Sequence, residues 1–196
     1  MGKTLEQKNI PAYLIYETLD GKDIYYKGWQ DVLNQSKTLE EIMGCSDLQG
    51  LIVSRILRYL YKFLDEDKYE ILTNEVGLHL GKKTNISSDI AIFDKKLLQK
   101  TPFKNKYFEI APMVVIEVDT NAETGDFSNP LNYYHLKTQK LLDFGVKEVV
   151  WIFSETKKVT YAQKGENWLT MDWDKEIKIL GNYTFSLGDL VKDEGI

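Results

Sequence analysis

The chain has 196 residues, a formal net charge of −5 and 28% charged residues, a composition typical of a folded globular domain. The negative charge argues against a nucleic-acid coat protein, although an enzyme can still bind nucleic acid through a local basic patch. The single cysteine, Cys45, excludes an internal disulfide and thiolate-rich zinc sites, and it fits a reducing compartment.

The sequence contains no signal for a membrane. No stretch approaches the ~20 apolar residues that a membrane-spanning helix requires. The first eight residues lack the apolar core of a signal peptide. We therefore expect a cytoplasmic protein without a membrane partner. We also expect residues 1–196 to form a single domain, with 1–11 as a flexible N-terminal arm.

The first expected element is a hairpin within residues 10–30. Two β-rich runs flank an Asp-Gly pair at 20–21, which is a common hairpin turn. The same region carries the aromatic residues Tyr25, Tyr26 and Trp29. These side chains either pack the N-terminal segment onto the core or offer a contact to a second copy of the chain.

The remaining elements follow from apolar periodicity and from turn residues. A helix over 47–64 has apolar residues at three- and four-residue steps and a cap at Ser46 or Asp47, and a weaker helix covers 30–43. Pro130 begins a further helix that ends at Phe144, before Gly145. Strand-like segments are 69–73, 76–80, 86–93, 112–119, 149–153, a hairpin within 158–171, and 183–187; 81–85 is expected to be a turn and 94–111 a basic connection.

The most informative stretch is 112–119. Its continuous apolar run predicts a central strand buried on both faces, and it ends in two carboxylates, Glu117 and Asp119. Because side chains alternate along a strand, both are expected on one face. A strand, a helix and a strand then follow in order, which predicts a parallel pair. The expected class is α+β, with an α/β-like core built on a mixed sheet.

Asp89 precedes one strand, Glu117 ends another, and Lys137 lies on the following helix. Carboxylates on adjacent strands, with the carbonyl of Val118, form an oxygen-lined site of the kind that Mg²⁺ binds. A nearby lysine could hold or deprotonate an attacking water and balance developing negative charge. Asp119 is either an extra metal ligand or a cap of the loop.

Three segments and one lysine resemble the Uma-two family of the PD-(D/E)xK, restriction-endonuclease-like superfamily. They are 88–92 (SDIAI), 111–118 (APMVVIEV), Lys137, and 145–151 (GVKEVVW). The resemblance covers roughly 12–191. It implies a mixed core sheet of four to five strands with helices on both sides and additional β-hairpins.

The resemblance also assigns roles. Asp89 and Glu117 match the metal-binding carboxylates, Lys137 matches a lysine carried on the helix, and Thr120 matches a small hydroxyl position. The chain departs from the family pattern at three positions: Ser88 replaces the proline, Asp119 stands where a strict E-x-K motif has lysine, and Gln49 occupies a helix position often filled by histidine.

These observations predict a Mg²⁺-dependent endonuclease that hydrolyses phosphodiester bonds in DNA, with Mn²⁺ able to substitute. Asp89 and Glu117 would hold the metal, and Lys137 would position the water. The alternative is a catalytically silent module of the same fold that binds nucleic acid or a protein partner. In that case, Glu117 and Lys137 would form only a buried ion pair. Cleavage of both strands would favour a homodimer.

Overall fold

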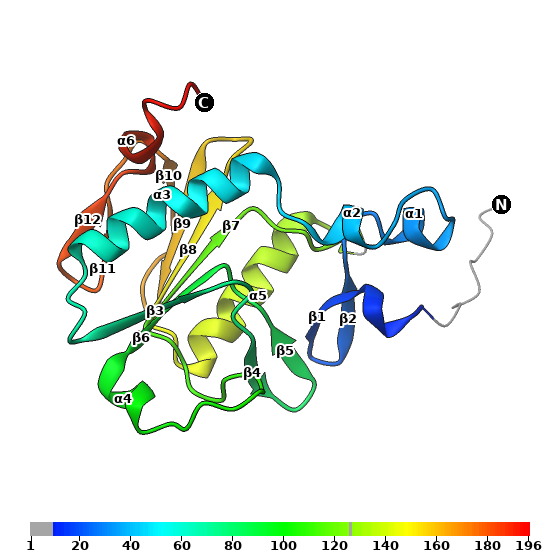
Figure 1. Cartoon of the computed structure of the whole chain (residues 1–196), viewed down its shortest axis with the longest axis horizontal. Coiled ribbons are helices and arrows are strands. Elements are labelled where there is room, and N and C mark those ends of the chain that lie inside the picture. The colour runs from blue at the N-terminus through cyan, green and yellow to red at the C-terminus, as the bar shows by residue number, and fades with distance from the viewer. Residues whose placement is uncertain (1–9, 126) are drawn as a thin grey trace.

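The computed structural model describes residues 10–125 and 127–196 (Figure 1). In chain order the strands are β1 (Ile15–Leu19), β2 (Lys22–Tyr25), β3 (Tyr69–Thr73), β4 (Leu78–Gly81), β5 (Thr84–Ile86), β6 (Ile90–Asp94), β7 (Val114–Val118), β8 (Glu148–Phe153), β9 (Lys158–Gln163), β10 (Leu169–Asp172), β11 (Ile177–Ile179) and β12 (Tyr183–Phe185). The helices are α1 (Trp29–Leu33), α2 (Glu40–Met43), α3 (Asp47–Phe63), α4 (Lys95–Gln99), α5 (Pro130–Phe144) and α6 (Leu187–Val191), and Ala12–Leu14 forms a short 3₁₀ turn.

The main sheet is mixed and has six strands in the order β10-β9-β8-β7-β6-β3. Strands β7 and β8 are parallel, and the other neighbouring pairs are antiparallel. The parallel pair is joined through α5, as the strand–helix–strand pattern predicts. The mixed α+β class is therefore confirmed, although the main sheet has six strands where the resemblance implies four to five.

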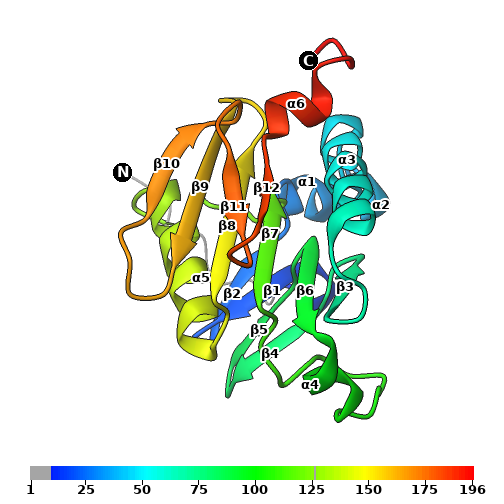
Figure 2. The same ribbon diagram turned by 90° about the vertical axis from the view of Figure 1, so that its left-hand side faces the viewer.

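Side chains of the central strands alternate between two apolar layers. On one face, Ile116 and Val118 of β7 pack against α3, the helix drawn in cyan in Figure 2. On the other face, Val115 packs with α5 and with the smaller sheet. Figure 2 shows α3 and α5 on opposite sides of the main sheet. Glu117 shares the strand parity of Val115, so it lies in the layer on the α5 side.

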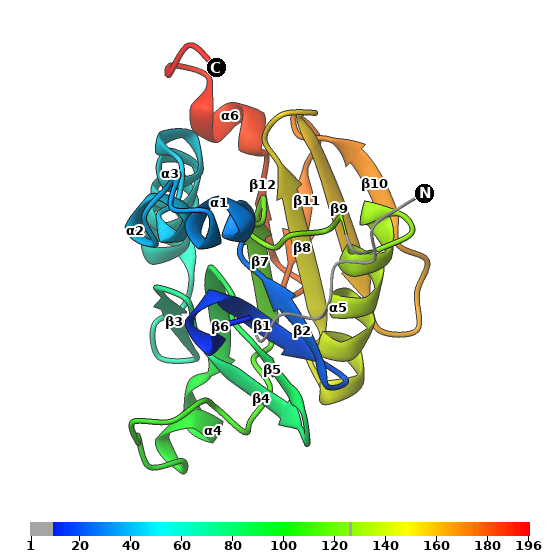
Figure 3. The same ribbon diagram turned by 90° about the vertical axis from the view of Figure 1, so that its right-hand side faces the viewer.

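A second sheet, β2-β1-β5-β4, contributes to the layer on the α5 side (Figure 3). The β1–β2 hairpin turns at Asp20 and Gly21, whose φ angles of 52° and 81° are those of the type I′ turn that an Asp-Gly pair favours. The hairpin is tied to the loop after β7. Lys27 N donates to Asn121 O at 2.6 Å, and Glu123 N donates to Tyr25 O at 2.7 Å.

Several predicted boundaries differ from the structure. The helix expected over 30–43 is two short helices, because Gln35 adopts a left-handed φ of 59° that ends the first one. The turn expected over 81–85 is tighter, since β5 already begins at Thr84. The connection over 94–111 contains α4, which the Asp94 side chain caps by accepting from Leu97 N.

Most of the predicted N-terminal arm, residues 1–9, lies outside the described residues. Within 10–30, the aromatic side chains contact one another: Tyr25 and Trp29 lie 5.1 Å apart by ring centroid, and Tyr16 and Tyr26 lie 5.2 Å apart. Both contacts join aromatic side chains within the N-terminal segment. In the described residues, no helix is long and apolar enough to cross a membrane.

Candidate active site

The two carboxylates predicted from sequence lie at adjoining strand ends. Strands β6 and β7 pair with Ile90 opposite Ile116, so extending that register by one residue places Asp89 opposite Glu117. Asp89 Oδ2 accepts a 2.7 Å hydrogen bond from Val118 N, which fixes the aspartate against the end of β7. The structure therefore brings Asp89, Glu117 and the backbone of Val118 together.

Lys137 reaches the same place from α5. Its side chain is completely buried, and its Nζ lies 3.2 Å from Glu117 Oε1. It also donates a 3.0 Å hydrogen bond to the carbonyl oxygen of Ser87, two residues before Asp89. Three segments that are distant in the sequence thus converge, and each supplies one of the predicted residues.

A fourth charged residue, Glu17, completes this cluster. It lies on β1, and its Oε2 is 3.0 Å from Lys137 Nζ. Its other oxygen accepts a 2.7 Å hydrogen bond from the hydroxyl of Tyr133 on α5. Glu17 was not among the site residues predicted from the sequence. The available signal was its position between Ile15 and Leu19, which places a glutamate at the inward-facing step of an alternating strand.

Negative charge exceeds positive charge in the cluster. Burial raises the pKa of Glu117 to about 8, an effect that Lys137 only partly offsets. Burial also raises the pKa of Asp89 to about 6, against the lowering effect of the Val118 amide. Burial opposes the charge on Lys137, but the carboxylates of Glu117 and Glu17 outweigh it and hold the lysine pKa well above its usual value. A single ammonium group thus faces three carboxyl groups.

Gln49 and Thr120 also border the cluster. Gln49 is buried in the first turn of α3, and its side-chain hydrogen bond to Asp89 works to lower the pKa of that carboxyl. The Thr120 hydroxyl accepts a 3.1 Å hydrogen bond from Ala122 N and so shapes the loop after β7. Ser88, at the position where the superfamily has proline, is buried, and its backbone pairs with Val76 in both directions.

Asp119 faces a different partner. Asp119 lies just beyond the end of β7 and has a left-handed φ of 55°. Both of its carboxylate oxygens bind Ser154, one through the backbone amide at 2.8 Å and one through the hydroxyl at 2.6 Å. This arrangement favours the loop-cap interpretation over an extra metal ligand.

The residues present fit a hard divalent cation. Glu117 Oε1 is buried and accepts no well-aligned hydrogen bond, although Lys137 lies within ion-pair distance of it. The surplus negative charge is a second reason to expect a cation there. No group of three or more His, Cys, Asp or Glu among residues 10–125 and 127–196 is arranged to hold a metal. A cation would therefore depend on Asp89, Glu117, the Val118 carbonyl and water, and Mg²⁺ commonly binds through one or two carboxylates and several waters.

Comparisons with known proteins identify the family of the chain. The model of the Uma2 (Uma-two) family, described as "putative restriction endonuclease", matches residues 36–177, which is more than half of the chain. The chain belongs to the Uma2 family.

A solved structure supports the fold of this family member. It is a protein from Anabaena variabilis, described as a putative nuclease belonging to DUF820, and it superimposes with a TM-score of 0.66 at 15% sequence identity. The match covers 90% of this chain and 89% of that chain. At this identity the likeness shows the fold alone. No curated protein matched the chain significantly.

Proposed function

We propose that this Uma2 protein is a Mg²⁺-dependent endonuclease that hydrolyses phosphodiester bonds in DNA, with Mn²⁺ able to substitute. The observation that carries the proposal is the convergence of Asp89, Glu117 and Lys137 from two adjacent strands and a helix. Family membership adds weight to it. A structural ion pair would need one carboxylate for one lysine, whereas this cluster has an excess of carboxylates.

In this proposal, Asp89 and Glu117 hold the cation, with the Val118 carbonyl as a further ligand. When bound, the cation supplies Lewis-acid stabilisation of the charge that develops on the phosphate. The raised pKa of Lys137 keeps its side chain an ammonium ion, so it acts as a hydrogen-bond donor to the attacking water rather than as a base. Glu17 positions that ammonium, and Tyr133 positions Glu17.

The test is cleavage of single- and double-stranded DNA by the purified protein with Mg²⁺ or Mn²⁺. We expect cleavage by the wild type and its loss in Asp89→Ala, Glu117→Ala and Lys137→Ala. Lys140→Ala is the matched control, because Lys140 lies on the same helix and pairs with Asp20 away from the cluster. A wild-type protein that cuts neither substrate with either metal would reject the proposal.

A second candidate function is a nuclease-fold module that binds nucleic acid or a protein partner without cleaving it. The burial of the reactive groups favours this candidate: Glu117 is 3% exposed and Lys137 is 0% exposed. Mn²⁺ titration with thermal melting separates metal binding from turnover. A cation that binds the native protein at about 100 times its Kd adds about 2.7 kcal/mol of stability. Equal stabilisation of wild type and Glu117→Ala would remove the proposed metal site.

A further inference from the structure

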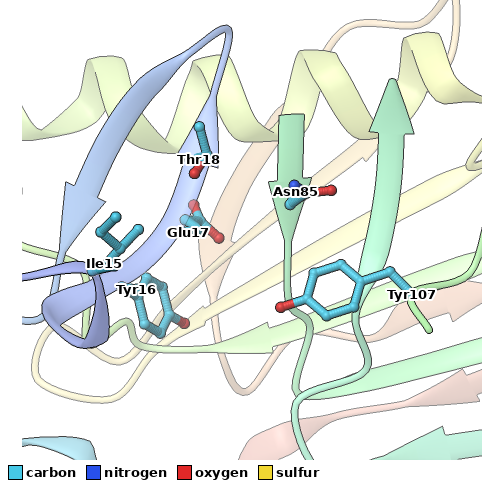
Figure 4. A pocket seen from close by; sticks show the side chains of 7 residues that line it. Ile15, Tyr16, Glu17, Thr18, Asn85 and Tyr107 are labelled. Carbon is cyan, nitrogen blue, oxygen red and sulfur yellow. The ribbon is translucent and has the colours of Figure 1, made fainter. Parts of the chain in front are cut away.

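A pocket of about 400 Å³ opens between β1 and β5, beside the charged cluster. Figure 4 shows side chains from three segments around it: Tyr16, Glu17 and Thr18 from β1, Asn85 from β5, and Tyr107 from the loop that precedes β7. Its volume is within the range of small-molecule sites, roughly 300 to 1,000 Å³. It is large enough for a group of the size of a nucleobase.

The pocket adjoins the candidate active site through β1. Glu17 lines the pocket, and the same carboxylate lies 3.0 Å from Lys137 Nζ. Tyr16 also lines it, and the centre of its ring is 5.8 Å from the same nitrogen. A DNA strand bound at the candidate active site would therefore pass close to this pocket.

Tyr107 presents an aromatic side chain that is 53% exposed but held in place. A Cβ on Gly77 would stand 2.5 Å from the Tyr107 ring, so the ring occupies space that only glycine leaves free. The neighbouring residue Phe108 exchanges hydrogen bonds with the start of β4: its N donates to Gly77 O at 2.9 Å, and its O accepts from His79 N at 2.8 Å. An exposed ring on a fixed backbone is a suitable stacking surface.

The polar side of the pocket is also fixed. Asn85 Oδ1 lies 2.6 Å from His79 Nδ1, a contact that holds the amide in place, and the nitrogen of an amide is a donor of the kind that the edge of a base accepts. In Figure 4, the hydroxyl of Tyr107 points across the gap toward Tyr16. The pocket thus combines an aromatic surface with an amide that can form hydrogen bonds. Sites that hold an unstacked base combine these two features.

We propose that this pocket receives one nucleobase of the bound DNA strand, with the base stacked on Tyr107. The proposal rests on the proposed nuclease function for the identity of the ligand, and it adds a substrate class. Because a base in an intact duplex is stacked and paired, the substrate is single-stranded DNA or a duplex with an unpaired base.

The test compares two probes of equal length and charge: a labelled thymidine oligonucleotide and a sugar–phosphate chain of abasic sites. Binding is measured by fluorescence anisotropy in EDTA, so that no cleavage occurs. Stacking of one base on an aromatic side chain corresponds to a change in affinity of about 5-fold or more. We expect the wild type to bind the thymidine probe more tightly by at least that factor.

Tyr107→Ala should reduce this preference toward equal binding of the two probes. Gly77→Ala should have the same effect by displacing the ring without removing it. Tyr61→Ala is the matched control, because Tyr61 is 63% exposed on α3 and does not line the pocket. It should keep the wild-type preference.

Equal binding of both probes by the wild type, or an unchanged preference in a folded Tyr107→Ala protein, would overturn the base-binding proposal. Neither result depends on turnover. If the protein cuts DNA but binds both probes equally, the base-binding proposal is wrong and the proposed nuclease function stands. If the protein prefers the thymidine probe but never cuts DNA, the proposed nuclease function is wrong and the base-binding proposal stands.

Discussion

Lys137 is the residue on which the candidate site depends. Its ammonium group lies 3.0 Å from Glu17 and 3.2 Å from Glu117, and its side chain is completely buried. Pairs of this kind add little stability relative to apolar replacements, but removing one partner is costly because it leaves an uncompensated buried charge. Replacement of Lys137 alone therefore tests whether its ammonium group compensates the buried carboxylates of Glu17 and Glu117.

We predict that Lys137→Met destabilises the metal-free protein by about 3–5 kcal/mol at pH 9, because Glu17 and Glu117 then lack a cation. The free energy of unfolding is measured by urea denaturation in EDTA. The penalty should shrink at low pH, where the carboxyl groups take up protons. With Lys137 in place, burial raises the pKa of Glu117 to about 8; the lysine lowers this pKa, so its loss raises the pKa further and the penalty should still be growing at pH 9.

Two further variants control this measurement. Lys140→Met removes a lysine from the same helix whose ion pair with Asp20 is partly exposed, and it should cost no more than about 1 kcal/mol. The double variant Glu17→Gln/Lys137→Met removes one of the stranded carboxylates and should recover part of the loss. If Lys137→Met and Lys140→Met lower the free energy of unfolding by similar amounts, the buried charge of Lys137 is no more important for stability than an exposed one.

The residues of the site differ in how far sequence could predict them. Asp89, Glu117 and Lys137 were predicted because each is placed by a local pattern: a strand start, a strand end and a helix face. Glu17 was not, because it joins the cluster only when β1 folds over α5, and its hydrogen-bond partner Tyr133 is 116 residues away in the sequence. The hydrogen bonds from Asp119 to Ser154 could not be predicted either, because the two residues are 35 positions apart and meet only when β7 pairs with β8.

At the scale of elements, β8 holds the β11–β12 hairpin through a buried glutamate. Glu148 Oε2 accepts a 2.9 Å hydrogen bond from Leu180 N, in the turn of that hairpin. Burial raises the pKa of Glu148 above its ordinary value of 4.5, although the Leu180 amide opposes the shift. The folded state therefore binds this proton more tightly than the unfolded state does. Its contribution to stability is present below pH 4.5 and is lost as the pH rises through the folded pKa.

We predict that Glu148→Gln becomes progressively more stable than wild type as the pH rises above about 4.5, since glutamine cannot ionise. Glutamine keeps the volume and an oxygen that can accept from Leu180 N, so the hairpin contact remains. Thermal melting of both proteins across this range measures the difference. A difference that is independent of pH would show that Glu148 titrates at the same pH in the folded and unfolded states.

The elements with strong local signals were predicted with the best boundaries. Helix α5 begins at Pro130 and ends before Gly145 as predicted, because a proline at the first turn and a glycine at the end fix both limits. Strands β7 and β8 are apolar except for Glu117 and Glu148. By contrast, α4 depends on the cap at Asp94, and the break between α1 and α2 depends on the left-handed residue Gln35. Apolar periodicity predicts neither feature.

At the scale of the whole molecule, each chain supplies one cluster containing Asp89, Glu117 and Lys137. A single site hydrolyses one strand at each encounter, so cutting a duplex requires two chains or two successive encounters. The aromatic residues proposed as a dimer contact, Tyr25 and Trp29, pack against each other within one chain. The homodimer stays a prediction.

We predict that the proposed nuclease nicks supercoiled plasmid before it linearises it, as expected of a monomer with one active site. The ratio of linear to nicked product should rise with protein concentration only to the extent that chains associate. Gel electrophoresis of a time course at several protein concentrations measures this ratio, and sedimentation measures the oligomeric state under the same conditions. Glu117→Gln is the inactive control, since it keeps the volume of the side chain and removes its charge.

Linear product that forms without a nicked intermediate at every concentration would contradict a monomeric enzyme. It would require a stable pair of chains with both active sites engaged on one duplex.

The base-binding pocket leads to a prediction about the form of the plasmid. If the enzyme needs an unpaired base, supercoiled plasmid should be cut faster than relaxed plasmid, because negative supercoiling favours local strand opening. Equal rates on supercoiled and relaxed plasmid would mean that strand opening does not limit cleavage.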